Sequence, residues 1–275
     1  MAILKKDNSD EKVISKFAEA ALAEQKRSRR WGIFFKLLTF GYLIALLFMF
    51  GQSSSHSPAH SGDFTAFISL NGIIGDQMEV NAKDFKSSMK KAYDDPGTKG
   101  VILAINSPGG SPVQSGIIND EIKKYRQLRP DIPVYAVVED ICASGAYYIA
   151  VAADQIFVDK ASIVGSIGVR LDQFGLDKAI KHLNIERRLI TAGENKAILD
   201  PFLPFKPEHK KHPENLLAEV HRQFIDVVKE GRAGKLSNNN DIFSGLFWNG
   251  EGAIHLGLAD QLGNIDYVEI GRAHV

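Results

Sequence analysis

The sequence predicts an α/β fold with mostly parallel strands and crossover helices, preceded by one transmembrane helix. Short apolar or β-branched runs alternate with helical patterns through most of the chain. The helical stretches are long enough to connect parallel neighbouring strands. Near the N-terminus, one apolar run is long enough to cross a bilayer.

The membrane-spanning prediction covers residues 31–51, which carry a single charge at Lys36. As a helix, this run spans about 31 Å, close to the ~30 Å core of a bilayer. The basic cluster Lys26–Arg30 precedes the run and no comparable cluster follows it, so the positive-inside rule places the N-terminus in the cytoplasm. A cleaved signal peptide is the alternative, but the long N-terminal region and the lack of a small-residue cleavage site favour an uncleaved anchor.

The chain divides by composition into four parts. Residues 1–30 form a cytoplasmic tail that is partly helical, and residues 31–51 form the anchor. Residues 52–62, "QSSSHSPAHSG", have the composition of a flexible linker. Residues 63–275 then form one extracytoplasmic domain, with a length typical of a single domain.

Within this domain the elements alternate in order along the chain. The predicted strands cover residues 64–70, 100–106, 133–139, 155–159 and 185–190. The predicted helices cover residues 81–95, 111–129, 144–153, 171–184 and 212–234. Continuous apolar character in "GVILAIN" is typical of a buried parallel strand, and Pro112 suits the first turn of a helix.

Composition excludes several classes of protein and site. The 33 basic and 33 acidic side chains give no net charge, which argues against nucleic-acid binding. The single cysteine, Cys142, excludes an intrachain disulfide framework and a multi-cysteine zinc site. The close pairs His56/His60 and His209/His212 lie among Ser, Pro and Lys, which indicates solvated loops. We therefore expect no metal site, and the mechanism that the resemblance below implies calls for no cofactor.

A glycine pair follows the strand at 100–106, in "INSPGGSP". Gly109 and Gly110 allow a tight turn that exposes backbone N–H groups at the carboxyl end of that strand. Such groups suit a phosphate or a developing oxyanion. An ordinary strand-to-helix turn is the alternative interpretation.

Ser144 occupies the equivalent place after the strand at 133–139, at the edge where ligand sites of α/β sheets form. A serine before a glycine at a helix start is most often an N-cap. However, Ala143, Gly145 and Ala146 leave space around the hydroxyl that a cap does not need. The residues alone leave both a cap and a nucleophile open.

A nucleophilic serine requires a base within hydrogen-bond reach. The first histidine after Ser144 is His182, which lies in a polar helical pattern. A lysine can act as the base where an apolar site lowers its pKa towards neutrality. Lys196 follows a glycine turn and precedes an apolar triplet, but spacing alone does not choose it over Lys178 or Lys160.

Five motifs taken together resemble a known family. They are "SPGGSP", "CASGAYYIAVAAD", "GSIGV", "GENKAILDPF" and "FSGLFWNGEGAIHLGLADQLG", in that order. The chain resembles, over residues 64–266, the short bacterial form of the signal peptide peptidase A family. This resemblance implies a ClpP/crotonase-like fold and a membrane-anchored Ser–Lys serine protease.

The resemblance also assigns roles by position. It implies Ser144 as nucleophile, Lys196 as general base and Ser166 of "GSIGV" as the residue that orients the lysine. It implies an oxyanion hole made by Gly109 and the amide of Gly145.

One departure from a related pattern supports this assignment. The ClpP relatives of the family carry a catalytic histidine about 25 residues after the serine, and this chain has Val169 there. The departure favours the Ser–Lys branch.

The implied function is a membrane-anchored serine endopeptidase that degrades remnant signal peptides after their release from secreted proteins. We expect a single-pass protein of the bacterial inner membrane, with its catalytic domain on the periplasmic side. In the family's long form, the lysine and serine lie in different halves. A short form is therefore expected to form a ring-shaped homo-oligomer, in which Lys196 of one subunit serves Ser144 of its neighbour.

Residues 241–263 are apolar and aromatic enough for subunit contacts, but closing the domain's own core is an equal alternative. Two other functions also remain open. A crotonase-like acyl-CoA enzyme would share the fold, but such an enzyme is expected in the cytoplasm. The predicted membrane anchor therefore argues against it. A non-catalytic membrane scaffold would keep the fold and would not react with a serine-directed fluorophosphonate.

Overall fold

The computed structural model describes residues 8–51 and 62–270, and the chain divides into two compact units, residues 1–59 and 60–275. The first unit contains α1 (Asn8–Gly51), a single helix of 44 residues and about 66 Å. Its stretch Ser15–Leu47 is long and apolar enough to cross a membrane. The predicted anchor thus lies in a helix, and the tail is helical from Asn8. Residues 52–61 of the predicted linker, with His56 and His60, lie outside the described residues.

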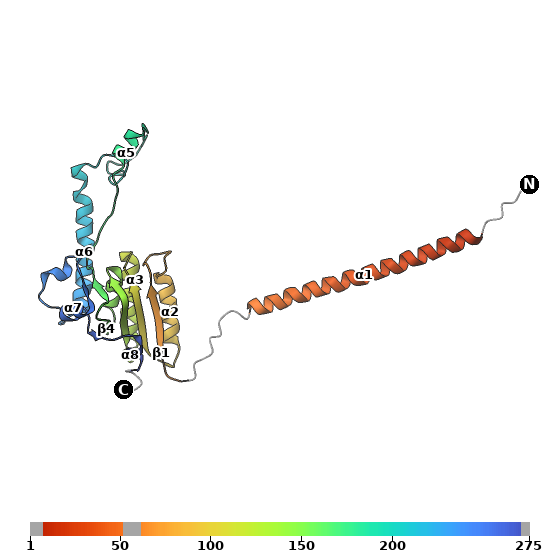
Figure 1. Cartoon of the computed structure of the whole chain (residues 1–275), viewed down its shortest axis with the longest axis horizontal. Helices are drawn as coiled ribbons and strands as arrows, with labels where there is room; N and C mark the ends of the chain where they lie inside the picture. Colours follow the sequence, from red (N-terminus) through yellow and green to blue (C-terminus); the bar gives the residue numbers. More distant parts are fainter. Residues whose placement is uncertain (1–7, 52–61, 271–275) are drawn as a thin grey trace, which may run out of the picture. The chain divides into compact units, whose positions relative to one another are not determined.

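The second unit is built on a seven-stranded sheet (Figure 1). Its main path runs β1-β2-β3-β4-β7 with every pairing parallel, while β5 pairs with β3 and also, antiparallel, with β6. The strands are β1 (Phe64–Asn71), β2 (Thr98–Ser107), β3 (Val134–Ala143), β4 (Gln155–Val158), β5 (Ile163–Gly165), β6 (Phe247–Asn249) and β7 (Gln261–Leu262). The predicted α/β class with mostly parallel strands is confirmed.

Helices connect these strands. They are α2 (Ala82–Asp94), α3 (Pro112–Leu128), α4 (Gly145–Ala150), α5 (Asp177–His182), α6 (Lys211–Gly231), α7 (Gly250–His255) and α8 (Ile265–Ile270), with 3-10 turns η1 (Pro207–His209) and η2 (Asn240–Phe243). The starts of α2 and α3 follow from their sequences. Asn81 and Ser111 accept capping bonds from backbone amides of the first turn, and Pro112 needs no amide partner there.

The two faces of the sheet differ in the size of their cores. On one face, alternate residues of β2 and β3 such as Leu103 and Val138 join a large buried cluster with α2, α3, α4 and α6. On the other, Ile102, Val137 and Phe157 pack against Val268 of α8. Because side chains alternate across a strand, burial on both faces explains why "GVILAIN" is continuously apolar.

The stretch after β5 differs from the prediction. The helix expected at 171–184 is reduced to α5, and the strand expected at 185–190 is wrong, because no regular element forms there. Side chains at 185–190 are all exposed and no strand lies beside them to complete a ladder. We call residues 171–206 the extension. Figure 1 shows α5 projecting away from the sheet, beyond the start of α6.

The extension is held together mainly by its own contacts. Arg187 forms an ion pair with Asp200, and its guanidinium lies 5.2 Å from the ring centroid of Phe202. The amide of Leu176 donates to Pro201 O at 2.6 Å. Residues far apart in the extension are therefore fixed side by side.

Residues 241–263 divide between the two interpretations that the sequence left open. Ile242, Ala253 and Leu258 are fully buried in the domain's own core. Leu246, just before β6, Phe247 in β6 and Leu262 in β7 are exposed. Core closure therefore accounts for most of this segment but not for its three exposed apolar residues.

Candidate active site

Ser144 lies at the carboxyl end of β3, where the chain turns into α4. Its backbone has φ 54° and ψ −121°, which is a strained conformation for a residue with a side chain. Its amide donates to Gly165 O of β5 at 2.8 Å, which fixes the turn against the neighbouring strand. The side chain forms no capping hydrogen bond, so the N-cap interpretation does not account for this serine.

The glycine pair at the end of β2 packs directly against this turn. Gly109 has φ 98°, and a Cβ added there would lie 2.7 Å from the Gly145 nitrogen. Gly110 has φ 153°, and a Cβ there would lie 2.0 Å from Ile74 O. Both positions therefore require glycine for conformation and for space. Ile74 braces the pair, donating to Gly109 O at 3.0 Å and accepting from Ser111 N at 2.8 Å.

Two backbone amides of this cluster are open to a ligand. The Gly109 amide donates to Ser107 Oγ at 3.2 Å. By contrast, the amides of Gly110 and Gly145 form no hydrogen bond within the described part of the chain. Gly110 is also exposed, whereas Gly109 is buried. The geometry therefore offers Gly110 rather than Gly109 as the partner of the Gly145 amide.

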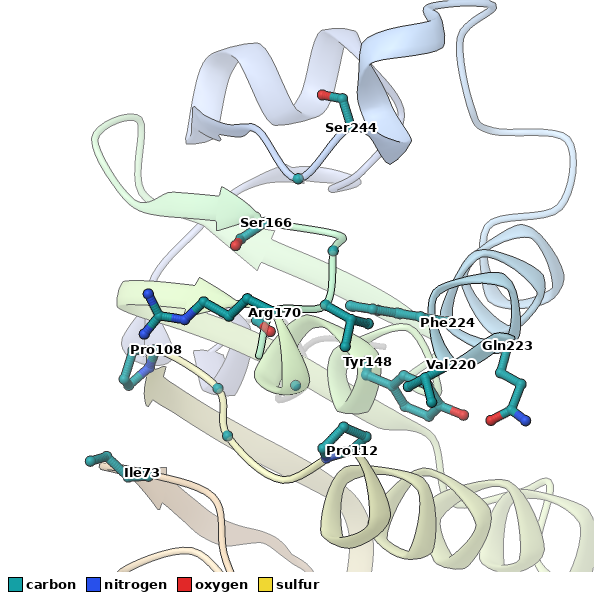
Figure 2. A pocket seen from close by; sticks show the side chains of 17 residues that line it. Ile73, Pro108, Pro112, Tyr148, Ser166, Arg170, Val220, Gln223, Phe224 and Ser244 are labelled. Atoms are coloured by element: carbon teal, nitrogen blue, oxygen red, sulfur yellow. The ribbon is translucent and has the colours of Figure 1, made fainter. Parts of the chain in front are cut away.

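Ser144 opens into a pocket of about 680 Å³ between the sheet edge and α6 (Figure 2). Its lining comes from the β2 turn, the β3 turn, the chain after β5, and one face of α6. The lining residues are Ile73, Pro108, Gly109, Gly110, Pro112, Ser144, Gly145, Tyr148, Ser166, Gly168, Val169, Arg170, Val220, Gln223, Phe224, Ser244 and Gly245. A substrate chain in this pocket would meet apolar walls and the Ser144 hydroxyl together.

Ser166 lies at the end of β5 on the wall of the same pocket. Like Ser144, it has φ 54°, and its amide donates to Leu246 O at 2.7 Å. Behind it, His221 Nε2 of α6 donates to Ile167 O, with 3.0 Å between the two atoms. The turn that carries Ser166 is thus fixed both by the β6 side of the sheet and by α6.

Lys196 does not join this group within one chain. It lies in the extension, is exposed, and is not among the pocket-lining residues. Lys178 on α5 and Lys160 after β4 do not line the pocket either. The structure thus brings together Ser144, Ser166 and the glycines and leaves every lysine considered above outside.

Buried groups beneath the site are structural in character. Burial raises the pKa of the Cys142 thiol well above its usual range, so this side chain is a packed apolar residue. Burial likewise raises the pKa of Tyr147, whose hydroxyl donates to Leu258 O at 2.8 Å. Among the described residues no group of three or more His, Cys, Asp or Glu side chains could hold a metal ion.

Sequence reasoning missed several residues of this site. Ile74 braces the glycine pair through its backbone alone, so its side chain carries no signal. Val220, Gln223 and Phe224 share one face of α6, and amphipathic spacing predicts a packed face without showing that a pocket lies against it. Arg170 follows directly after "GSIGV", but an isolated arginine in a loop is ordinary in a sequence.

Comparisons with known proteins identify relatives of this chain. The model of "Peptidase family S49" matches residues 126–271, a stretch that includes Ser144, Ser166 and Lys196. A putative signal peptide peptidase SppA of Enterococcus faecium is 30% identical over 204 residues, covering 71% of this chain and 59% of that protein. A putative protease of Methanocaldococcus jannaschii is 35% identical over 187 residues, covering 68% of this chain and 59% of that protein.

A third relative carries a different name. A protein of Brucella abortus named "Na(+)/H(+) antiporter NhaA" is 48% identical over 182 residues, covering 64% of this chain and 24% of that protein. The name describes a protein of which the matched part is about a quarter. The chain thus spans between about a quarter and three fifths of the length of these relatives.

Proposed function

Because this chain belongs to peptidase family S49, the family of the signal peptide peptidases, we propose that it is a membrane-anchored serine endopeptidase with Ser144 as nucleophile and Lys196 as general base. The observation that carries the proposal is the conformation of Ser144. Ser144 is held at positive φ between a strand and a helix, forms no capping bond and lies beside two unpartnered amides. This is the placement expected of a nucleophilic serine at a strand-to-helix turn.

The proposed reaction is acyl transfer to Ser144. Ser144 Oγ attacks the peptide carbonyl while neutral Lys196 accepts its proton. The amides of Gly110 and Gly145 stabilise the oxyanion of the tetrahedral intermediate, and Gly109 allows the close approach of the two turns. Lys196 then protonates the leaving amine, and water releases the acyl group. Ser166, on the wall beside Ser144, orients the lysine.

We further propose that Lys196 comes from a neighbouring subunit. Two features support this: Lys196 lies outside the pocket of its own chain, and the extension exposes large apolar side chains. Phe174 is 81% exposed and Ile190 is 97% exposed. A partner that covers such side chains while delivering a lysine satisfies both features. The contact joins two different surfaces, so it is heterologous, and we propose that it closes into a ring rather than an open filament.

The proposed setting is the bacterial cytoplasmic membrane. The apolar stretch of α1 supports an anchor, and the basic cluster Lys26–Arg30 before it supports a cytoplasmic N-terminus with the second unit on the periplasmic side. A ring of sites at the membrane surface suits extended peptides and excludes folded proteins. Remnant signal peptides are the proposed substrates, supported by the name of the Enterococcus relative.

The test is covalent labelling of the full-length chain in detergent with a fluorophosphonate. We expect one adduct, at Ser144, together with hydrolysis of apolar peptides. The Ser144→Ala variant should lose both, and Ser162→Ala, a matched change at a buried serine outside the pocket, should keep both. A folded, assembled wild type that neither labels nor hydrolyses peptides would instead indicate a scaffold.

A further inference from the structure

Arg170 stands out in the pocket because of its charge. Of the described residues that line the pocket with Ser144, Arg170 alone carries an ionised side chain at neutral pH. It follows Val169, four residues after Ser166, at the end of the chain segment that leaves β5. Figure 2 shows its side chain extending from that segment towards Pro108 of the β2 turn. The guanidinium thus lies at the pocket that would receive the scissile peptide.

The guanidinium is available for a ligand. Its side chain is 87% exposed, and its Nε lies 3.4 Å from Asp172 Oδ2, the one ion pair it makes within the described part of the chain. That pair is solvent-exposed on both sides and therefore weak. The two terminal nitrogens of the guanidinium form no hydrogen bond to any described residue, so its fork of donors faces outward unengaged.

The surroundings of Arg170 determine which ligand it suits. Val169, Val220 and Phe224 give the pocket an apolar wall, and Tyr148 adds an aromatic surface. A planar guanidinium binds a carboxylate with two parallel hydrogen bonds. A peptide that places apolar side chains on this wall and a carboxylate near the scissile bond would satisfy both features.

We propose that Arg170 is a specificity-determining residue that binds a substrate carboxylate next to Ser144. The inference rests on the proposed peptidase function and names its preferred substrate class: apolar peptides with a carboxylate near the cleaved bond. Two sources share this chemistry. One is the free C-terminus of a fragment left by an earlier endoproteolytic cleavage, and the other is an Asp or Glu side chain within a longer peptide.

The test compares peptides of one apolar sequence on the full-length chain in detergent. One peptide has a free C-terminal carboxylate, one a C-terminal amide, and a series of amides carries a single Asp at successive positions. We expect kcat/KM to be about tenfold higher for a carboxylate peptide than for the plain amide, and the ratio to fall as salt is added. The favoured peptide identifies the source of the carboxylate.

Variants connect that ratio to Arg170. Arg170→Gln should bring the ratio to about one, and Arg170→Glu should invert it. Arg129→Gln is the matched control, because Arg129 forms an exposed ion pair with Asp131 outside the pocket and its loss should leave the ratio unchanged. A wild-type ratio near one, or an unchanged ratio in Arg170→Gln, overturns the inference.

Binding separates this inference from the proposed function. The dissociation constants of the same peptides for the Ser144→Ala chain need no turnover, and they should show the same preference for a carboxylate and the same dependence on Arg170. A carboxylate preference without hydrolysis by wild type would sustain the site and refute the peptidase. Hydrolysis without the preference would sustain the peptidase and refute the role of Arg170.

Discussion

The sheet edge that carries Ser144 and the extension that carries Lys196 are built in opposite ways. At the sheet edge, backbone hydrogen bonds join the turn after β3 to β5 and the turn after β2 to Ile74, and the two turns pack closely at Gly109 and Gly145 above a large buried core. The extension has few buried side chains and exposes apolar ones such as Phe174. The proposed nucleophile is thus fixed by its own chain, while the proposed base lies on a segment that its own chain does not bring to the pocket.

The largest effect is expected when two inactive variants are mixed, which tests whether the serine and the lysine of one site come from different subunits. Ser144→Ala and Lys196→Ala chains should each lose at least about 10³-fold in kcat. If each site takes its base from a neighbour, chains dissociated and reassembled together should regain a fraction of wild-type activity, since some interfaces join an intact serine to an intact lysine. The measurement is peptide hydrolysis by mixed oligomers whose co-assembly is verified by two affinity tags.

Two controls make that experiment decisive. Each variant reassembled with itself should stay inactive, and a double variant mixed with Ser144→Ala should also stay inactive, because that mixture contains no serine nucleophile. Verified mixed oligomers without recovered activity would place both residues in the same chain and remove the contrast.

A charge in the extension should weaken assembly and leave the domain folded. Ile190→Glu replaces a side chain that is 97% exposed, so the fold of one subunit loses no packing. If a neighbour covers Ile190, the buried charge should disfavour the oligomer and lower activity by at least about tenfold. Light scattering measures the assembly, and thermal unfolding measures the subunit.

The matched control is Leu128→Glu, at the exposed end of α3 and outside the pocket. It adds the same charge in place of an exposed apolar residue of similar size and should leave the oligomer and its activity unchanged. Equal effects of the two changes would mean that the extension is no special contact surface.

In the unit that carries the sheet, the ion pair of Arg232 and Asp260 should stabilise the folded state. Arg232 is 2% exposed and donates to Asp260 and to Gly257 O. Asp260→Asn keeps the shape but leaves the guanidinium without its charge partner. We expect a loss of about 2–3 kcal/mol, less than for a fully buried pair because Asp260 is partly solvated. Thermal unfolding at pH 7 is the measurement.

The same pair predicts a pH dependence. Although desolvation opposes it, hydrogen bonds from Arg232 and Lys235 hold the pKa of Asp260 below its usual value. A carboxyl with a lowered folded-state pKa contributes stability above its unfolded pKa, and this stability is lost as pH falls below about 4. Wild type should therefore lose its advantage over Asp260→Asn in acid. A constant difference from pH 3 to pH 7 would exclude this linkage.

The contrast also explains what the sequence could predict. The strands and helices around Ser144 follow from periodicity, caps and glycine turns, which are local signals that the buried core reinforces. In the extension, "IERRLI" has strand-like composition but no neighbouring strand, so the predicted strand at 185–190 does not form. The short strands β5 and β6 are too short to show an alternation. Their pairing depends on contacts between residues more than 80 positions apart, which no local pattern reports.

The amide partner of Gly145 illustrates the same limit at the site. Sequence motifs favour the glycine pair as a whole, and position within the motif suggested Gly109. The choice between Gly109 and Gly110 depends on the Ser107 hydroxyl, which occupies the Gly109 amide. That hydrogen bond arises from the local path of the turn and has no signature in residue types.

The smallest expected effect concerns backbone strain at Ser144, at the sheet edge. Ser144 has φ 54° and ψ −121°, a conformation that glycine adopts without cost, so Ser144→Gly should relieve strain. Part of the gain is offset by the greater entropy of glycine in the unfolded chain, which leaves about 1 kcal/mol, or roughly 2–4 °C in Tm. Ser144→Ala is the matched control, because it removes the same hydroxyl and keeps the strained Cβ.

Asn184→Gly gives the comparison in the extension. Asn184 has φ 51°, which asparagine tolerates, so the Tm of the Asn184→Gly variant should change less. A Tm for Ser144→Gly no higher than that of Ser144→Ala would show that the turn stores no strain at Ser144.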